Sequence, residues 1–301
     1  MLLTIKKHKD LEVLTYDEMF KHLIDDGIIE SNISIIRKDK ERLICIFTDG
    51  NKEYVLKMGN HEKRHNGDDS TKYELLKKED RIYMALNALS DSDRARFPEI
   101  YAGGDVDDKF YYILMERVNG VTLYDYLRVG PHRRDAVLSI LINLTAAIQA
   151  LYSLGLVHGD LSVENVMIGL DGAVKLIDFE KTHKINISRN VDINIRGVPT
   201  GWRNSYLKNQ GVGYFYLIVQ TLDSTGHYDS GLIATIKKAI EDCHYPSCNN
   251  VYEACGRILT KATSSSRSRS RSSRQLSRSR RSKSRSRSRG SRNVTRRSSR
   301  P

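Results

Sequence analysis

Three side chains in the middle of the chain have types and spacing that suit phosphate and metal chemistry. Asp160 and Asn165 lie five residues apart in Val157–Asn165, and Asp178 follows in Leu176–Glu180, at the end of an apolar run. Carboxylate and amide oxygens are the hard ligands that Mg²⁺ takes, and a carboxylate beside an apolar strand is costly unless it binds something. Phosphoryl transfer from a nucleotide needs such ligands, a carboxylate that orients the attacking hydroxyl, and a cation that holds the phosphates.

The two segments resemble the protein kinase superfamily, whose motifs are His-Arg-Asp-x-x-x-x-Asn and Asp-Phe-Gly. The resemblance implies that Asp160 is the catalytic base, that Asn165 is a metal ligand, and that Asp178 is the main metal ligand. It also implies ATP as the phosphate donor, with Mg²⁺ or alternatively Mn²⁺ as the metal. Asp160 alone is also a typical helix cap, but the three residues at this spacing are hard to obtain by chance.

Other segments extend the resemblance over residues 28–260. Lys57, in Tyr54–Met58, matches the lysine of the Val-Ala-Ile-Lys motif, which implies that it contacts the phosphates. A glutamate on the following helix should hold that lysine, with Glu79 as the first candidate and Glu74 as the second. The competing interpretation of Glu79 is an ordinary charge on a solvated helix face.

The segment Leu114–Gly120 resembles the linker that holds the adenine of ATP in this superfamily. The resemblance implies that Met115 lies behind the adenine and that the backbone of Glu116 and Val118 bonds the adenine edge. Further along, Arg196–Arg203 resembles a segment that holds a peptide substrate.

The chain also departs from the family pattern. Gly27–Ser34 stands where a glycine-rich loop is expected, and there only Ser31 and Asn32 are small polar residues that suit a phosphate. Three positions in the two central motifs differ as well: Gly159 replaces Arg, Ser162 replaces Lys, and Glu180 replaces Gly. Loss of the Arg argues against switching by a phosphorylated loop, and loss of the Gly removes a flexible hinge. These features are similar to compact atypical and virus-like kinases.

The elements that must position these residues follow from periodicity. Strands are expected near 33–37, 43–47, 54–58, 100–102, 111–116 and 174–177, with Asp49–Asn51 as a hairpin turn. Helices are expected near 15–24, 73–89, 133–154, 212–222 and within 231–260. This order predicts an α+β fold with a strand-rich first lobe, a helix-rich second lobe and a cleft between them. The expected divisions are an N-terminal helical extension (1–26), an N-terminal lobe (27–114), the linker and C-terminal lobe (115–262), and a disordered tail (263–301).

The tail dominates the charge of the chain. It holds 15 of the 49 Lys and Arg residues and no acid, which leaves 34 basic against 37 acidic residues in 1–262. Contact with RNA or DNA is therefore expected through the Arg-Ser repeats of the tail and not through the bulk charge of the folded part. Nuclear import and phosphorylation of many serines are the other functional roles that the repeats suggest. Such a segment has too few apolar residues to fold; its alternative role is a solubilising tail.

Nothing in the sequence indicates secretion or a membrane span. The cysteines Cys243, Cys248 and Cys255, with His244, fit no common zinc spacing, so reduced thiols in a nuclear or cytoplasmic protein (in a host cell, if viral) are expected. The oligomeric state is left open.

The leading hypothesis is an ATP-dependent protein serine/threonine kinase with Asp160 and Lys57 as catalytic residues. Its substrates would be proteins, including Arg/Ser-rich or basic proteins and its own tail. One alternative is a pseudokinase scaffold with a nucleic-acid-binding tail, which the missing glycine-rich loop favours. The other is a small-molecule kinase, which the His-Gly-Asp-Leu form of residues 158–161 suggests.

Overall fold

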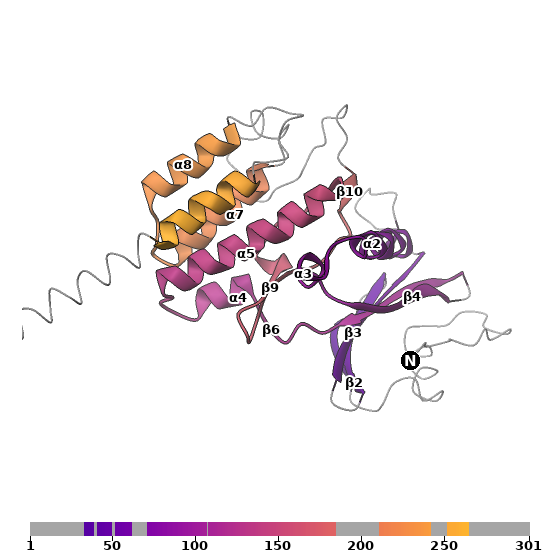
Figure 1. Cartoon of the computed structure of the whole chain (residues 1–301). Helices are drawn as coiled ribbons and strands as arrows, with labels where there is room; N and C mark the ends of the chain where they lie inside the picture. The colour runs from indigo at the N-terminus through magenta and orange to yellow at the C-terminus, as the bar shows by residue number, and fades with distance from the viewer. Residues whose placement is uncertain are drawn as a thin grey trace, which may run out of the picture.

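The computed structural model describes residues 33–38, 41–49, 52–61, 71–106, 108–184, 211–241 and 252–264. Several expectations lie outside the described residues: the helix at 15–24, Ser31, Asn32, the segment Arg196–Arg203, and the tail from residue 265 onward. Within the described part, the two-lobed α+β architecture is confirmed (Figure 1).

The N-terminal lobe is built on one antiparallel sheet in the order β1-β2-β3-β5-β4. All five strands were expected, and each is longer than its β-rich run because pairing with a neighbour extends the ordered backbone. Their bounds are β1 Ile33–Lys38, β2 Arg42–Asp49, β3 Lys52–Asn60, β4 Ile100–Val106 and β5 Phe110–Glu116. β2 pairs with β3 up to Asp49 and Lys52, which agrees with the expected hairpin.

The two faces of this sheet pack against different cores. Successive side chains of a strand point to opposite faces, and directly paired residues share a face. Leu56 of β3 and Leu114 of β5 are paired and belong to a core confined to the N-terminal lobe, whereas Ile113 and Met115 belong to the core shared with the C-terminal lobe. Lys57 is paired with Ile113, so it lies on the shared face.

Helix α2 (Lys72–Leu86) packs on that shared face, and the short helix α3 (Asp91–Arg94) follows it. α2 begins at the N-cap Thr71, which forms a reciprocal capping box with Glu74. The helix ends three residues before the expected Leu89. Its apolar face includes Leu76 and Tyr83, both buried.

The C-terminal lobe begins with β6 (Gly120–Thr122) and α4 (Leu123–Arg128) and is organised around α5 (Arg134–Ser153). Short strands and one 3₁₀ turn carry the central motifs: β7 Leu156–Val157, η1 Val163–Asn165, β8 Val166–Gly169, β9 Val174–Leu176 and β10 His183–Lys184. The expected helices near 212–222 and within 231–260 are α7 (Gly211–Ser224), α8 (Ser230–Glu241) and a helix over residues 252–264. That last helix extends two residues beyond the boundary expected at 262.

Helix α5 is long and apolar enough, by length and composition, to cross a membrane. Most of its apolar side chains are buried among the other elements of the lobe, including Leu141 and Leu144, neither of which is exposed. α5 is therefore the core helix of the C-terminal lobe.

The two cysteines that the structure describes are free and buried. Burial raises the pKa of the Cys45 thiol to about 12 and that of the Cys255 thiol to about 11. Both side chains are therefore protonated near neutral pH. Cys243 and Cys248 lie outside the described residues.

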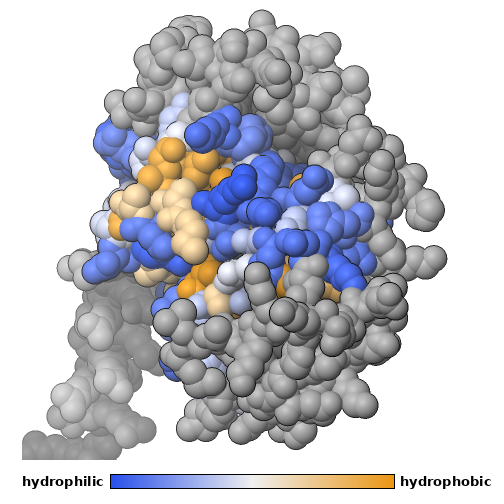
Figure 2. All heavy atoms as spheres, turned by 90° about the vertical axis from the view of Figure 1, so that its right-hand side faces the viewer, coloured by the Kyte–Doolittle hydropathy of each residue, from blue (hydrophilic) through white to orange (hydrophobic). Residues whose placement is uncertain are grey.

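The lobes are joined by the segment between β5 and β6 (Figure 1). The shared hydrophobic core runs from α2 through Phe97 and Phe179 to α5 and α7. Seen from the right-hand side of Figure 1, the described surface carries mainly hydrophilic side chains, with smaller apolar areas (Figure 2).

Candidate active site

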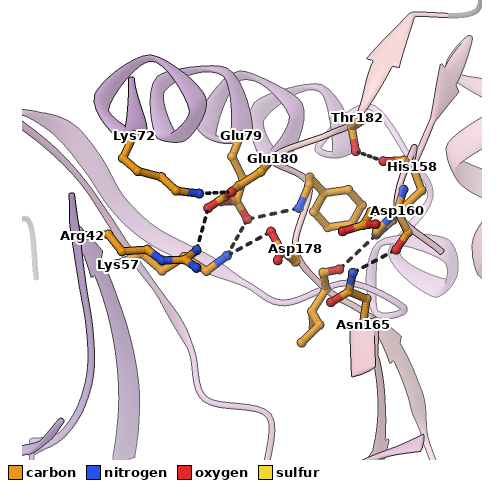
Figure 3. Close-up of polar contacts among 12 residues, drawn as sticks. Arg42, Lys57, Lys72, Glu79, His158, Asp160, Asn165, Asp178, Glu180 and Thr182 are labelled. Carbon is orange, nitrogen blue, oxygen red and sulfur yellow. Dashed lines mark hydrogen bonds and ion pairs between the residues drawn. The ribbon is translucent and has the colours of Figure 1, made fainter. Parts of the chain in front are cut away.

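The lysine predicted to contact phosphates lies on β3 and is already held by carboxylates. Lys57 Nζ lies 2.8 Å from Glu79 Oε1 and 3.7 Å from Asp178 Oδ1. The three residues come from β3, from α2 and from the segment after β9, and they converge in Figure 3. Residues that are far apart in the sequence therefore form one charged cluster between the lobes.

Of the two candidate partners of Lys57, Glu79 is the one in contact. Its side chain is fully buried, and Oε1 also accepts a hydrogen bond from the backbone N–H of Phe179 at 3.2 Å. Glu74 instead caps α2 through Thr71. The interpretation of Glu79 as a solvated charge is therefore wrong.

The loop after β7 holds Asp160 and Asn165 in a fixed arrangement. The Asn165 amide donates to the carbonyl oxygen of Asp160 at 2.9 Å. His158, which is buried, donates from Nε2 to the carbonyl of Ile177 at 3.0 Å and accepts at Nδ1 from the N–H of Asp160 at 3.3 Å. Both ring nitrogens are used, so the neutral tautomer with its proton on Nε2 fits this site.

Gly159 allows the segment after Asp178 to lie directly against this loop. Its φ is +76°, and a Cβ there would collide with the carbonyl oxygen of Lys181. The buried hydroxyl of Thr182 donates to the carbonyl of His158 at 3.1 Å. The glycine that replaces the expected Arg thus stands where backbone approaches backbone.

Asp178 follows β9 and is tied to the loop through its neighbour. The N–H of Ile177 donates to the carbonyl of Asn165 at 3.0 Å, so the two expected metal ligands lie on hydrogen-bonded segments. Asp178 has a φ of +66°, which short polar residues tolerate better than most. This conformation follows the end of β9 and directs its carboxylate toward Lys57 (Figure 3).

Phe179 anchors the metal-binding segment in the core. Its ring is fully buried and lies 5.1 Å from the ring of Tyr83 on α2 and 5.1 Å from the ring of His158, between centroids. The ring of Phe97 lies 5.9 Å away. Aromatic packing therefore connects α2, the metal-binding segment and the loop of Asp160.

The cluster is electrostatically coupled. Burial lowers the pKa of Lys57, but the carboxylates of Glu79 and Asp178 outweigh it, so the net pKa is raised and the lysine stays cationic. Burial raises the pKa of Glu79, and Lys57 opposes this shift. Burial also raises the pKa of Asp178, but Lys57 and other groups carry it below its ordinary value. Asp178 is thus an anion near neutral pH, as a metal ligand must be.

The residues present fit a divalent cation. Asp178 Oδ1 is buried and accepts no hydrogen bond within the described part of the chain, which leaves it available as a ligand. The amide nitrogen of Asn165 is used by Asp160, which leaves the amide oxygen for a metal. Carboxylate and amide oxygens are the donors that Mg²⁺ prefers.

The linker residues lie at and beyond the end of β5. Met115 is buried, is paired with Val55 of β3, and shares the sheet face of Lys57, as a residue behind a nucleotide base would. The N–H of Glu116 donates to the carbonyl of Glu99 at 2.8 Å, so within this arrangement Glu116 offers an adenine only its carbonyl oxygen. Val118 is half-buried and follows on the same segment. The adenine contacts of Glu116 and Val118 stay predictions.

Four charged residues around the site were not predicted from the sequence: Arg42, Lys72, Lys78 and Lys181. Lys181 Nζ lies 3.0 Å from Asp160 Oδ1. Arg42 and Lys72 lie against the carboxylate of Glu180 (Figure 3). Lys78 donates a hydrogen bond to the backbone carbonyl of Glu180. The charged residue in place of glycine at 180 was the one sequence signal of the contacts of Glu180, because Arg42, Lys72 and Lys78 all lie more than a hundred residues earlier.

Comparison with known proteins agrees with this geometry. A model of the protein kinase domain matches residues 43–199, about half of the chain, which include Lys57, Glu79, Asp160, Asn165 and Asp178. The chain is similar to the serine/threonine-protein kinase zyg-8 of Caenorhabditis elegans, with 29% identity over 186 residues, which is 58% of this chain and 23% of the relative.

Two further relatives carry related names. A probable LIM domain-containing serine/threonine-protein kinase of Dictyostelium discoideum is 28% identical over 114 residues, 37% of this chain and 18% of the relative. The serine/threonine-protein kinase PrkC of Bacillus subtilis is 35% identical over 100 residues, 33% of this chain and 15% of the relative. Each of these matches spans less than a quarter of the relative's length.

Proposed function

The chain belongs to the protein kinase family, and on that premise we propose that it transfers the γ-phosphate of ATP to Ser or Thr hydroxyls of proteins. The observation that carries this proposal is the cluster of Lys57, Glu79 and Asp178 between the lobes. A buried lysine shared by two carboxylates is positioned to bind phosphates, because its charge is fixed and its amine is oriented.

Each residue has a distinct task in the proposed reaction. Lys57 binds the phosphates of ATP, and Glu79 keeps its ammonium group in place. Asn165 and Asp178 would hold Mg²⁺, which when bound neutralises charge on the phosphates. Asp160 accepts the proton of the attacking hydroxyl and orients it. Phe179 and His158 keep the two segments packed and so preserve this arrangement.

The chain itself suggests a class of protein substrate. Its tail consists of Arg-Ser repeats from Ser264 to Arg274 and from Ser282 to Arg289. A tethered segment has a high effective concentration at the site of its own chain when its length allows it to reach. We infer that serines in Arg/Ser-rich or basic proteins are acceptors, the tail included. Each phosphate would add nearly two negative charges to the tail and weaken its contact with RNA or DNA.

Labelled ATP tests the proposal. Wild-type protein is incubated with an Arg-Ser peptide, a basic protein or a panel of small hydroxyl metabolites, with Mg²⁺ or with Mn²⁺. Asp178→Asn removes the charged ligand but keeps a residue that tolerates positive φ. Asp108→Asn is the matched control, because Asp108 is the other described non-glycine residue with positive φ, at +55°, and lies in the turn between β4 and β5.

The three hypotheses give different results in this assay. A protein kinase labels the peptide or basic protein, loses that activity in Asp178→Asn and keeps it in Asp108→Asn. Label on a metabolite alone supports the small-molecule kinase. No label with either metal supports the scaffold and contradicts our proposal.

Autophosphorylation needs its own test. The variant truncated after residue 264 keeps the helix over 252–264 intact, unlike a truncation at 262. We expect label in the full chain and none in the truncated chain. Full-length Asp178→Asn protein mixed with active truncated protein then separates transfer between molecules from transfer within one. Equal label in the full and truncated chains would contradict the tail as acceptor.

A further inference from the structure

The residue after Phe179 has an unexpected side chain and an ordinary backbone. Glu180 stands where the family pattern has glycine. Asp108 and Asp178 are the described non-glycine residues with positive φ, so Glu180 does not adopt the conformation that requires glycine. A side chain at this position is therefore accommodated without backbone strain, and the question is what it does.

Glu180 is held by three cations from the N-terminal lobe. Its Oε2 accepts a hydrogen bond from Lys72 Nζ at 2.5 Å, and Oε1 lies 3.5 Å from Nη1 of Arg42. Its backbone carbonyl accepts a hydrogen bond from Lys78 Nζ at 3.1 Å. Figure 3 shows Arg42 and Lys72 directed at this carboxylate.

The side chains of Glu180, Lys72 and Arg42 are largely removed from water. The exposed fraction is 2% for the side chain of Lys72 and 13% for that of Glu180. By contrast, the pair of Lys181 and Asp160 has a lysine side chain that is 61% exposed. Exposed pairs contribute little, whereas removing one partner of a buried pair leaves an uncompensated charge. The contacts of Glu180 are thus the ones whose loss should change the structure.

The contacts fix the helix that carries Glu79. Lys72 is the first residue of α2, and Lys78 directly precedes Glu79. Glu180 therefore holds α2 at its N-terminus and again nearly two turns later. Arg42, the first residue of β2, connects the sheet to the same carboxylate. The same carboxylate and carbonyl thus join β2, α2 and the segment of Asp178.

We propose that Glu180 is a positioning residue, which holds α2 against the metal-binding segment and so keeps Lys57, Glu79 and Asp178 together without any modification of the chain. The catalytic part of this inference rests on the proposed kinase function. The structural part does not, because it concerns the position of α2 in the unliganded protein. The ion pairs of Glu180 with Arg42 and Lys72 would take the place of regulation by a phosphorylated loop.

Amide hydrogen exchange of the full-length protein tests the structural part. Glu180→Gly installs the glycine of the family pattern, and Glu180→Gln removes the charge at nearly constant size. We expect exchange in α2 and in residues 178–182 to become about tenfold faster in both variants, while α5 and α7 keep wild-type rates. The matched control is Glu253→Gln, which removes an exposed glutamate that pairs with Arg257 on the helix over 252–264.

Activity and pairwise coupling test the positioning role. We expect kcat to fall about tenfold in Glu180→Gln, with a smaller change in KM for the peptide, because fewer molecules have the assembled site. The double variant Lys72→Gln/Glu180→Gln should lose less than the sum of the single losses, since the two residues share one contact. Glu253→Gln should match wild type in both measurements.

Two results would overturn the inference. One is wild-type exchange in α2 for both Glu180 variants. The other is an increase that is equally large in α5 and α7, which would mean a general loss of stability. If the wild-type protein transfers no phosphate, the proposed function fails, and the exchange pattern alone decides whether Glu180 holds α2.

Discussion

Replacement of Glu79 by glutamine separates the role of its charge from the role of its shape. Glu79 Oε1 accepts two hydrogen bonds, from Lys57 at 2.8 Å and from the N–H of Phe179 at 3.2 Å. Glutamine keeps an acceptor oxygen but loses the charge. A hydrogen bond to a charged group contributes about 1.5–3 kcal/mol and a neutral one about 0.5–1.5 kcal/mol, so the bond from Phe179 loses about 1 kcal/mol. The bond from Lys57 keeps its charged donor but loses the attraction between opposite charges, a further loss of about 1 kcal/mol.

The expected kinetic result follows from these bonds. A total loss of about 2 kcal/mol lowers kcat/KM for ATP about 30-fold in Glu79→Gln. Stability should change by less than about 1 kcal/mol, because Asp178 still compensates the Lys57 ammonium and the substitution removes a buried carboxylate that is costly to desolvate. Lys57 still faces Asp178, 3.7 Å away. Activity and stability are therefore expected to respond differently.

Steady-state kinetics with ATP and urea unfolding measure the two quantities. Glu74→Gln is the matched control, because it changes the same residue type on the same helix and a capping box accepts glutamine as well as glutamate. We expect wild-type kinetics from it. Wild-type kcat/KM in Glu79→Gln, or an equal loss in Glu74→Gln, would contradict the proposed role of the Glu79 charge.

Two further predictions concern the loop of Asp160. Burial lowers the pKa of His158 below its ordinary 6.5, with Asp160, Asp178 and Lys181 as its charged neighbours. Below pH 6.5 the unfolded chain therefore binds a proton at His158 that the folded chain does not, so the free energy of unfolding falls as the pH drops. Urea unfolding at pH 5 to 7 should show a shallower fall in His158→Asn than in the wild type. Equal slopes in the two proteins would contradict this. Gly159→Ala should lower the free energy of unfolding by about 1–3 kcal/mol, because alanine is strained at positive φ and its Cβ meets the carbonyl of Lys181; a wild-type urea midpoint would show that the contact relaxes.

Local patterns were sufficient to predict the elements that carry the site. Strands β2 and β3 follow from β-rich runs on either side of a turn, and α2 follows from apolar residues at helical spacing. Even the choice of Glu79 has a local basis. It lies three residues after Leu76 and four before Tyr83, on the face of α2 that is buried.

What could not be predicted depends on contacts between distant segments. Lys72 is almost fully buried although its type favours the surface, and its partner Glu180 lies 108 residues later. No periodic pattern marks such a pair, because each residue by itself looks solvated. The hydrogen bond from the Glu116 N–H to the Glu99 carbonyl likewise depends on the register between β4 and β5.

The proposed function requires that this chain transfers phosphate and does not merely bind nucleotide. Asp160→Asn tests it most directly, because the substitution removes the proposed base and leaves Lys57, Asn165 and Asp178 in place. Calorimetric titration with Mg²⁺ and ATP should give an affinity close to that of the wild type, whereas transfer to an Arg-Ser peptide should fall by about 10²-fold or more. Wild-type transfer by Asp160→Asn would show that Asp160 is not the base and would contradict the proposed mechanism.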